Sequence, residues 1–221
     1  MQSLSSNTVG RDRITCLKQQ VQEYKRGICA ERALLWTEYF KNRKNRKKPV
    51  IVQIAEALRH VLLNKSVIVY PDELIVGNYT SKRVGGIIYP ELAGVPVLLD
   101  LFKYPRRAVN PLSISRKEQL KLAMILPFWV NRFIVTKAFP NPVQRMRFSW
   151  EQLKATDYSI YESGGIAHLA PDHAKLIALG TDAIKKEIEQ FMAQNTDKEK
   201  EAFYQAVLIS AEALALFGER Y

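Results

Sequence analysis

The residue types best suited to chemistry at neutral pH stand in one stretch, GGIAHLAPDHAKLIALG, which runs from residue 164 to residue 180. His168 titrates near neutrality, so it could donate a proton to a polar substrate or bind one. The alternative is a structural histidine, satisfied by backbone groups beside the glycine turn. Asp172 follows Pro171 at the start of an expected helix, where a carboxylate favours the helix dipole and caps the first turn. We take His168 and Asp172 as candidate substrate-binding residues, with capping the better explanation for Asp172.

Other reactive side chains give weaker signals. Cys16 and Cys29 are the only cysteines, and their spacing makes neither a disulfide framework nor a metal site. We expect both to be buried thiols in a reduced, cytoplasmic protein. The glycine pairs at residues 85–86 and 164–165 stand outside any strand–GxGxxG–helix setting, so turn geometry explains them better than a phosphate cradle. No catalytic residue and no metal site is therefore assigned.

The strongest compositional feature is the formal net charge of +11. Part of the excess lies in KNRKNRKKPV, where six of the eight residues from Lys41 to Lys48 are basic. Nucleic-acid binding would need this charge on a face with aromatic side chains or donors placed for bases. No aromatic residue interrupts the run, so the sequence favours a solvated loop and makes nucleic acid an unlikely partner.

The apolar pattern of the first half predicts two helices and then short strands. Apolar residues at three- and four-residue steps predict a long amphipathic helix from about Asp12 to Phe40, with Gly27 as a weak point. Pro49 fits the first turn of a second helix that ends near Leu63. The β-branched runs at residues 66–70 and 73–77 predict two strands around a turn. Four prolines between residues 90 and 111 predict a long irregular connection.

The second half predicts further helices. One begins near Ser113 or Ser115, and Pro127 is expected to kink or end it. Residues 139–148 are expected to form a loop. A helix over residues 171–194 is expected to bend at Gly180, and another runs over residues 197–221 without a cap, which indicates truncation. The fold class is mainly α with a small β element. The chain lacks both a run of eighteen apolar residues and a signal-peptide core, so no membrane segment is expected.

Four segments, in order, resemble the glycyl radical enzymes of the pyruvate formate-lyase family. They are EYKRGICAERALLWTEYF, VIVYPDELIVGNYT with the Tyr-Pro-Glu after it, GGIAHLAPDHAKLIALG, and EAFYQAVLISAEALALFGERY. The resemblance covers about residues 20–221. It implies that residues 1–221 are a partial domain of this type, the N-terminal helical part of an α/β barrel.

In this family an activating enzyme, which uses S-adenosylmethionine and an iron–sulfur cluster, generates a radical on a glycine near the C-terminus. The radical passes to a cysteine in the barrel, and the thiyl radical attacks the substrate. The resemblance implies that both radical carriers lie beyond residue 221, since neither Cys16 nor Cys29 matches the cysteine. The isolated chain is then expected to hold no cofactor and to be inactive.

The resemblance also gives His168 a role. Where pyruvate formate-lyase has an arginine for the substrate carboxylate, several dehydratase-like relatives have a histidine, so His168 favours the dehydratase branch. His173 stands where the family usually has a tyrosine, which leaves the function of that hydroxyl unassigned. The implied partners are a chain carrying the missing half or a second copy, and the activating enzyme only for a full-length protein. A free-standing remnant of this kind would expose apolar surface on its final helix.

Overall fold

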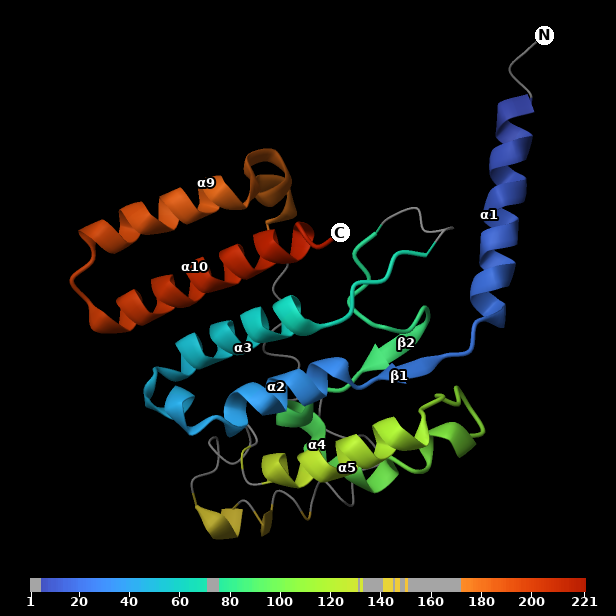
Figure 1. Ribbon diagram of the computed structural model, residues 1–221, viewed down its shortest axis with the longest axis horizontal. Helices are drawn as coiled ribbons and strands as arrows, with labels where there is room; N and C mark the ends of the chain where they lie inside the picture. Colours follow the sequence, from blue (N-terminus) through green and yellow to red (C-terminus); the bar gives the residue numbers. More distant parts are fainter. Residues whose placement is uncertain are drawn as a thin grey trace.

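The computed structural model of this chain describes residues 5–70, 76–130, 132, 141–144, 146–147, 150 and 172–221. The described part is mainly helical with one small parallel sheet, as the composition and periodicity predict (Figure 1). The elements, in chain order, are α1 (Ser5–Glu23), β1 (Gly27–Cys29), α2 (Glu31–Lys41), the 3-10 turn η1 (Arg43–Lys47), α3 (Val50–Asn64), β2 (Gly85–Ile87), α4 (Pro90–Asp100), the 3-10 turn η2 (Tyr104–Arg106), α5 (Arg116–Val130), α9 (His173–Gln194) and α10 (Lys198–Gly218).

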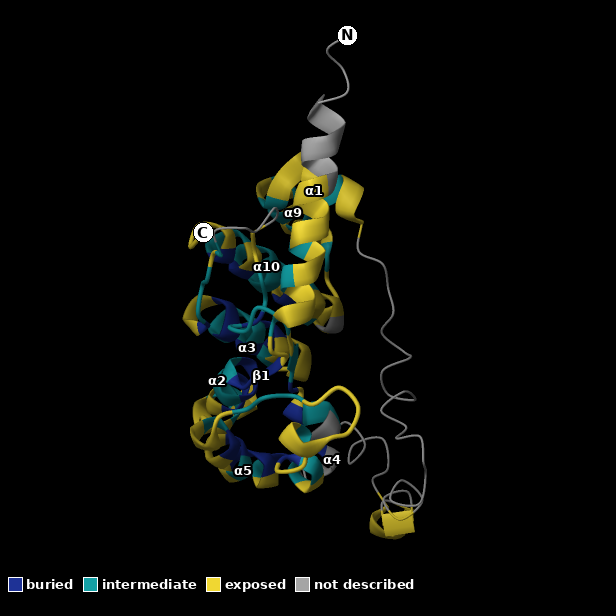
Figure 2. Cartoon of the chain, turned by 90° about the vertical axis from the view of Figure 1, so that its right-hand side faces the viewer, coloured by how far each residue is buried: buried dark blue, intermediate teal, exposed yellow. Residues whose placement is uncertain are grey.

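The helices pack in a row. α9 packs on α10, α10 on α3, α3 on α2, and α2 on α5, which pairs with α4. Figure 2 shows this stack from the side, with α1 projecting from it. Two neighbouring apolar clusters hold the lower part together. One surrounds Leu101, Leu122 and Leu126 between α4 and α5, and the other surrounds Trp36 and Trp129 between α2, α3 and α5.

The single helix expected from Asp12 to Phe40 is wrong, because the chain leaves the helix after Glu23 and forms β1. β1 pairs in parallel with β2, and the Gly27 N–H donates to the Val84 carbonyl at 2.8 Å. The two backbones approach closely, since a Cβ on Gly85 would lie 2.2 Å from the Gly27 oxygen. Glycine is therefore required at this contact. A helical period in the sequence cannot reveal this long-range pairing.

The strand predictions also change. Residues 66–70 form no strand, and residues 73–75 of the second run lie outside the described residues. β2 forms instead at Gly85–Ile87, so the glycine pair at residues 85–86 lies in a strand and not in the turn that the sequence favoured. The connection over residues 90–111 is not irregular throughout, because Pro90 begins α4 and Pro105 lies in η2. Proline suits the first turn of a helix, where its missing N–H would be unpaired anyway.

The helix signals of the remaining chain are mostly confirmed. Ser115 caps α5, since its hydroxyl accepts from the Glu118 N–H at 3.1 Å. Pro127 lies inside α5, which continues to Val130 instead of ending. Gly180 bends α9 with a φ of 71°, a left-handed conformation that favours glycine. In the expected loop over residues 139–148, residues 142–144 and 146–147 are helical.

The final helix does not run to the last residue as expected, because α10 ends at Gly218. Its 200–218 stretch is long and apolar enough to cross a membrane by length and composition alone, contrary to the expectation that no segment has this character. In the structure this helix packs against α3 on one side and α9 on the other. Ala213 and Phe217 are buried against Leu62 of α3, so protein contacts account for part of its apolar composition.

Candidate functional site

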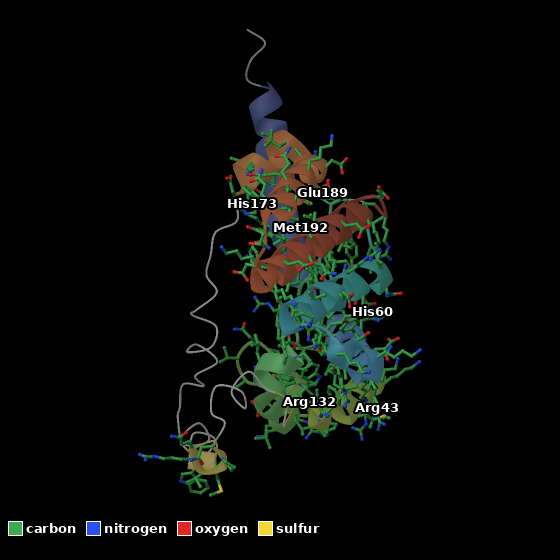
Figure 3. All side chains as sticks on the ribbon, turned by 90° about the vertical axis from the view of Figure 1, so that its left-hand side faces the viewer. Arg43, His60, Arg132, His173, Glu189 and Met192 are labelled. Atoms are coloured by element: carbon green, nitrogen blue, oxygen red, sulfur yellow. The ribbon has the colours of Figure 1, made fainter. Side chains whose placement is uncertain are left out.

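The main candidate from the sequence, His168, lies outside the described residues, as does the glycine pair at 164–165. Asp172 is described and caps α9, with its Oδ1 accepting the Lys175 N–H at 2.9 Å. The capping expectation is therefore confirmed, and contact of Asp172 with a substrate stays a prediction. His173 begins α9 and is exposed, far from His60 on α3 (Figure 3).

The structure joins the Glu-Arg-Ala and Tyr-Pro-Glu segments through one buried ion pair. Both terminal nitrogens of Arg32 donate to the carboxylate of Glu91, one of them at 3.1 Å. Arg32 is 8 % exposed, so the pair is largely removed from water. Its guanidinium carbon lies 4.4 Å from the ring centroid of Trp36 and 4.1 Å from that of Tyr89. This two-pronged, stacked geometry suits arginine and not lysine.

A second polar cluster surrounds Lys65 at the end of α3. Lys65 is 2 % exposed, and its Nζ donates to the carbonyls of Ser66 at 3.1 Å and Asn78 at 3.3 Å. The ammonium also lies 4.6 Å from the ring centroid of Phe217. Burial lowers the pKa of Lys65, and the nearby Glu31 carboxylate opposes that shift.

Glu31 fixes the same region from the start of α2. Its carboxylate accepts the Ser66 N–H at 3.0 Å and also the Ser66 hydroxyl. The two charged residues of the Glu-Arg-Ala sequence thus bind different partners. Glu31 binds Ser66, which follows α3, and Arg32 binds Glu91 at the start of α4. These contacts explain the sequence on structural grounds, since they tie α2 to two distant segments.

The last two residues close this cluster. Arg220 donates to the Leu62 carbonyl and to the Lys65 carbonyl, the latter at 2.7 Å. The Tyr221 hydroxyl donates to the Asn78 carbonyl at 3.1 Å. Three of the four segments that carry the family resemblance therefore meet around Lys65 and Asn78.

Sequence reasoning missed both arrangements. Arg32, Glu91 and Asn78 stand in segments that were recognised as family-like, but nothing in their spacing pairs Arg32 with Glu91. Lys65 gives no signal at all, because a lysine at the end of an amphipathic helix is ordinarily exposed. A buried lysine needs its partners to be known first.

The cysteines give a mixed result. Cys29 is buried as expected, on β1, and its Sγ lies 3.3 Å from the Ser81 hydroxyl. Cys16 is exposed on α1, which corrects the expectation that both thiols are buried. Within the described residues, no three histidine, cysteine, aspartate or glutamate side chains cluster as a metal site would require.

Within the basic segment Lys41–Lys48, which was expected to be a loop, Arg43–Lys47 form the 3-10 turn η1 and Lys41 ends α2. Most of its side chains are exposed, and Arg43 lies at the surface (Figure 3). Lys48 pairs with Glu56 of α3 at 2.6 Å. Burial alone would raise the pKa of Glu56, but the hydrogen bonds from Lys48 and Tyr39 lower it overall. The segment has the solvated character that the sequence favoured.

Comparison with known proteins places the chain in a family. Residues 6–221 match the family described as pyruvate formate lyase-like. The isethionate sulfite-lyase of Desulfovibrio desulfuricans is 25% identical over 95% of this chain and 26% of its own length. Two solved structures are also similar.

The first of these is the glycerol-bound, B12-independent glycerol dehydratase of Clostridium butyricum, at 26% identity with a TM-score of 0.80. The second is a glycyl radical enzyme of Archaeoglobus fulgidus, at 30% identity with a TM-score of 0.78. Each comparison covers 95% of this chain and 27% of the known chain. The chain therefore spans about a quarter of the length of the relatives it matches.

Proposed function

Because the chain belongs to the pyruvate formate lyase-like family, we propose that it is one section of a glycyl radical lyase or dehydratase and forms part of its substrate site. The observation that carries the proposal is the likeness of almost the whole chain to about a quarter of a glycerol dehydratase, at a TM-score of 0.80. The section corresponds to the N-terminal helical part of the barrel.

The residues proposed to contact the substrate are His168 and Asp172. His168 would donate a proton to a leaving hydroxyl, a role that histidine suits because its ordinary pKa lies near neutrality. Asp172 supports the start of α9 through Oδ1. A carboxylate has a second oxygen and further lone pairs, so the capping bond leaves capacity for a substrate hydroxyl.

The radical chemistry itself would be supplied from outside this section. The glycine that carries the radical and the cysteine that receives it would belong to the remaining part of the enzyme, and an S-adenosylmethionine-dependent activating enzyme would install the radical. Catalysis needs these groups and the substrate contacts in one preorganised site. The isolated chain is therefore proposed to be inactive.

The test begins on the gene and continues on the enzyme. We would translate the DNA downstream of the Tyr221 codon in all frames and look for a central cysteine followed by an Arg-Val-x-Gly glycine. In the enzyme so completed, His168→Ala should lower kcat by about a hundredfold or more, the contribution typical of a general acid.

His60→Ala is the matched control, because His60 lies on α3 beside Glu38. It should leave kcat unchanged. Unchanged turnover in the His168→Ala enzyme would remove His168 from the site. If no such reading frame is found, the proposal requires that a second chain supplies the radical carriers.

A further inference from the structure

α9 consists of two helical arms joined at Gly180. This glycine has a φ of 71° and a ψ of 177°, a conformation that essentially only glycine adopts. The first arm covers residues 173–179 and the second covers residues 181–194. Figure 1 shows the short first arm turning off the axis of the second. The bend therefore lies between the second arm and Asp172, one of the two residues proposed to contact the substrate.

The second arm is fixed to the neighbouring helices. Phe191 of this arm stacks on Tyr204 of α10, with the ring centroids 6.1 Å apart and the ring planes at 15°. α10 in turn packs along α3. The second arm is thus the anchored end of α9, and the position of the first arm depends on what holds the bend.

Gly180 permits the bend without holding its angle. A Cβ at this position would have no neighbour within 4 Å, so no close packing surrounds the bend. The first arm is also poorly buried. Ile177 is 84% exposed and Leu179 is 55% exposed, while Leu176 is half-buried. Apolar burial therefore contributes little to the position of this arm.

One ion pair spans the bend. The Lys175 Nζ lies 2.6 Å from the Glu187 Oε2, which joins the first arm to the second. In a straight α-helix these two residues would be about 18 Å apart along the axis, at about 1.5 Å per residue. That separation is beyond the combined reach of the two side chains. Because the pair forms only in the bent conformation, it shifts the population of α9 toward that conformation.

Lys175 is also the residue that Asp172 caps. The Asp172 Oδ1 accepts the Lys175 N–H at 2.9 Å, and the ammonium of the same lysine binds Glu187. A continuous polar chain thus leads from the candidate substrate contact to the anchored arm. Within the part of the chain that the structure describes, no other side chain of residues 172–179 forms a hydrogen bond or an ion pair.

We propose that Lys175 and Glu187 are positioning residues, which hold α9 in its bent form and so set where Asp172 meets the substrate. The inference rests on the proposed function, which makes Asp172 a substrate contact. Without the pair the first arm can rotate about Gly180, and Asp172 moves with this arm because its carboxylate is bonded to it. Each side chain of the pair is 39% exposed, so its loss should shift a population and leave the fold intact.

The test measures the position of the first arm in the full chain by pulsed electron paramagnetic resonance between two spin labels. Cys16→Ser removes the exposed thiol, and Cys29 is buried. The labels are attached through Ala174→Cys, next to the cap, and Gln205→Cys on α10, since both positions are exposed. The chain with the intact pair should give one narrow distance distribution.

Glu187→Lys turns the attraction across the bend into repulsion. The population outside the narrow distribution should rise by about fivefold, the upper end of what a partly exposed ion pair contributes. The exchanged variant, Lys175→Glu/Glu187→Lys, should restore the narrow distribution. Neither partial unfolding nor a general effect of charge would be reversed by this exchange.

The matched control is Asp182→Lys, which makes the same kind of change from an acid to a lysine on the second arm. Asp182 pairs with Lys185 at 2.6 Å inside that arm. The control should keep the wild-type distribution, because this pair does not span Gly180.

Four results would overturn the proposal. The first three are an unchanged distribution in Glu187→Lys, a broad distribution in the exchanged variant, and equal broadening in Glu187→Lys and Asp182→Lys. The fourth concerns the completed enzyme, where Glu187→Lys should raise KM by about threefold with kcat nearly unchanged. An unchanged KM there, in an enzyme whose KM does rise in Asp172→Ala, would show that the pair does not position Asp172. An unchanged KM in Asp172→Ala itself would count against the proposed function and leave the ion pair's effect on the bend intact.

Discussion

Arg32 and Glu91 illustrate how much a buried charge depends on its partner. Removing two charges from water costs several kcal/mol per ion, and their attraction offsets that cost only when the geometry is good. Here the geometry is two-pronged and the guanidinium lies over the rings of Trp36 and Tyr89. The pair joins α2 to the start of α4, so its value is in fixing the relative position of these two helices.

Removing one member of this pair should be strongly destabilising. Arg32→Met leaves the Glu91 carboxylate buried without its cation, so the free energy of unfolding should fall by about 3–5 kcal/mol. Urea denaturation followed by circular dichroism would measure the change. Lys48→Met breaks an exposed pair and should cost less than about 1 kcal/mol. Similar losses in the two variants would show that the Arg32–Glu91 pair has no special weight.

Lys65 should make stability depend on alkaline pH. Burial lowers its pKa from the ordinary 10.5, so the folded chain binds this proton less tightly than the unfolded chain does. The free energy of unfolding should therefore rise with pH between the lowered folded pKa and 10.5, and the cost of burying the charge should be fully present below that window.

The comparison variant is Lys65→Met, which cannot titrate. Subtracting its unfolding free energy from that of the wild type at each pH removes the contributions of other groups, including Tyr79, whose pKa burial raises. The difference should grow in favour of the wild type as the pH rises. A difference that stays constant with pH would contradict a buried charged Lys65.

At the scale of the element, α5 shows a helix start that the sequence specifies locally. The Ser115 hydroxyl accepts the Glu118 N–H at 3.1 Å, and Glu118 in turn accepts from the Ser115 hydroxyl at 2.7 Å and N–H at 3.1 Å. Lys82 also pairs with Glu118 at 3.0 Å. Burial would raise the pKa of Glu118, but the hydrogen bonds from Ser115 and Lys82 lower it overall.

The cap gives a direct prediction. Ser115→Ala should lower the free energy of unfolding by about 1 kcal/mol, because it leaves N–H groups of the first turn without an acceptor. Ser115→Asp should keep most of the stability, since its carboxylate can accept the same bond. Denaturation of the three chains at neutral pH would measure this, and equal losses in both variants would exclude capping as the cause.

Local signals of this kind explain which elements the sequence could predict. The start of α3 after Pro49, the cap of α9 at Asp172 and the bend at Gly180 each depend on a few adjacent residues. β1 and β2 could not be predicted in the same way. Their pairing is decided by residues far apart in the chain, and Gly27 looked like a weak point in a helix because its partner at Gly85 was unknown.

The candidate site shows the same division. Asp172 was predicted as a cap because its position after Pro171 is a local feature. The contacts of Arg32 with Glu91 and of Lys65 with Asn78 require the tertiary fold, so the sequence contained the residues without their pairing. The length of the final helix follows from its local apolar pattern, but only the packing of α10 against α3 and α9 shows that Phe217 is buried while Phe203 and Leu214 are exposed.

At the scale of the whole molecule, Arg220 links the end of α10 to the end of α3 by hydrogen bonds. Arg220→Met removes the charged donors that bind the Leu62 and Lys65 carbonyls. The free energy needed to open α10 should therefore fall by about 1–3 kcal/mol. Hydrogen exchange of α10 amides should become faster, while α5 amides keep their wild-type protection. Exchange that accelerates equally in both helices would show that α10 has no independent opening.

The position of α10 has a consequence for synthesis on the ribosome. α3 is made early, yet the surface that buries Leu62 comes from Ala213 and Phe217, which are translated much later. β1 likewise cannot form its pairing until residues 84–87 and Ser113 have been synthesised. Long-range pairing of this kind slows folding, and a nascent chain that shows apolar helix faces while it waits is prone to aggregate. During that interval the face of α3 that later packs on α10 is open, so this chain should depend on chaperones more than a helical bundle with sequential contacts would.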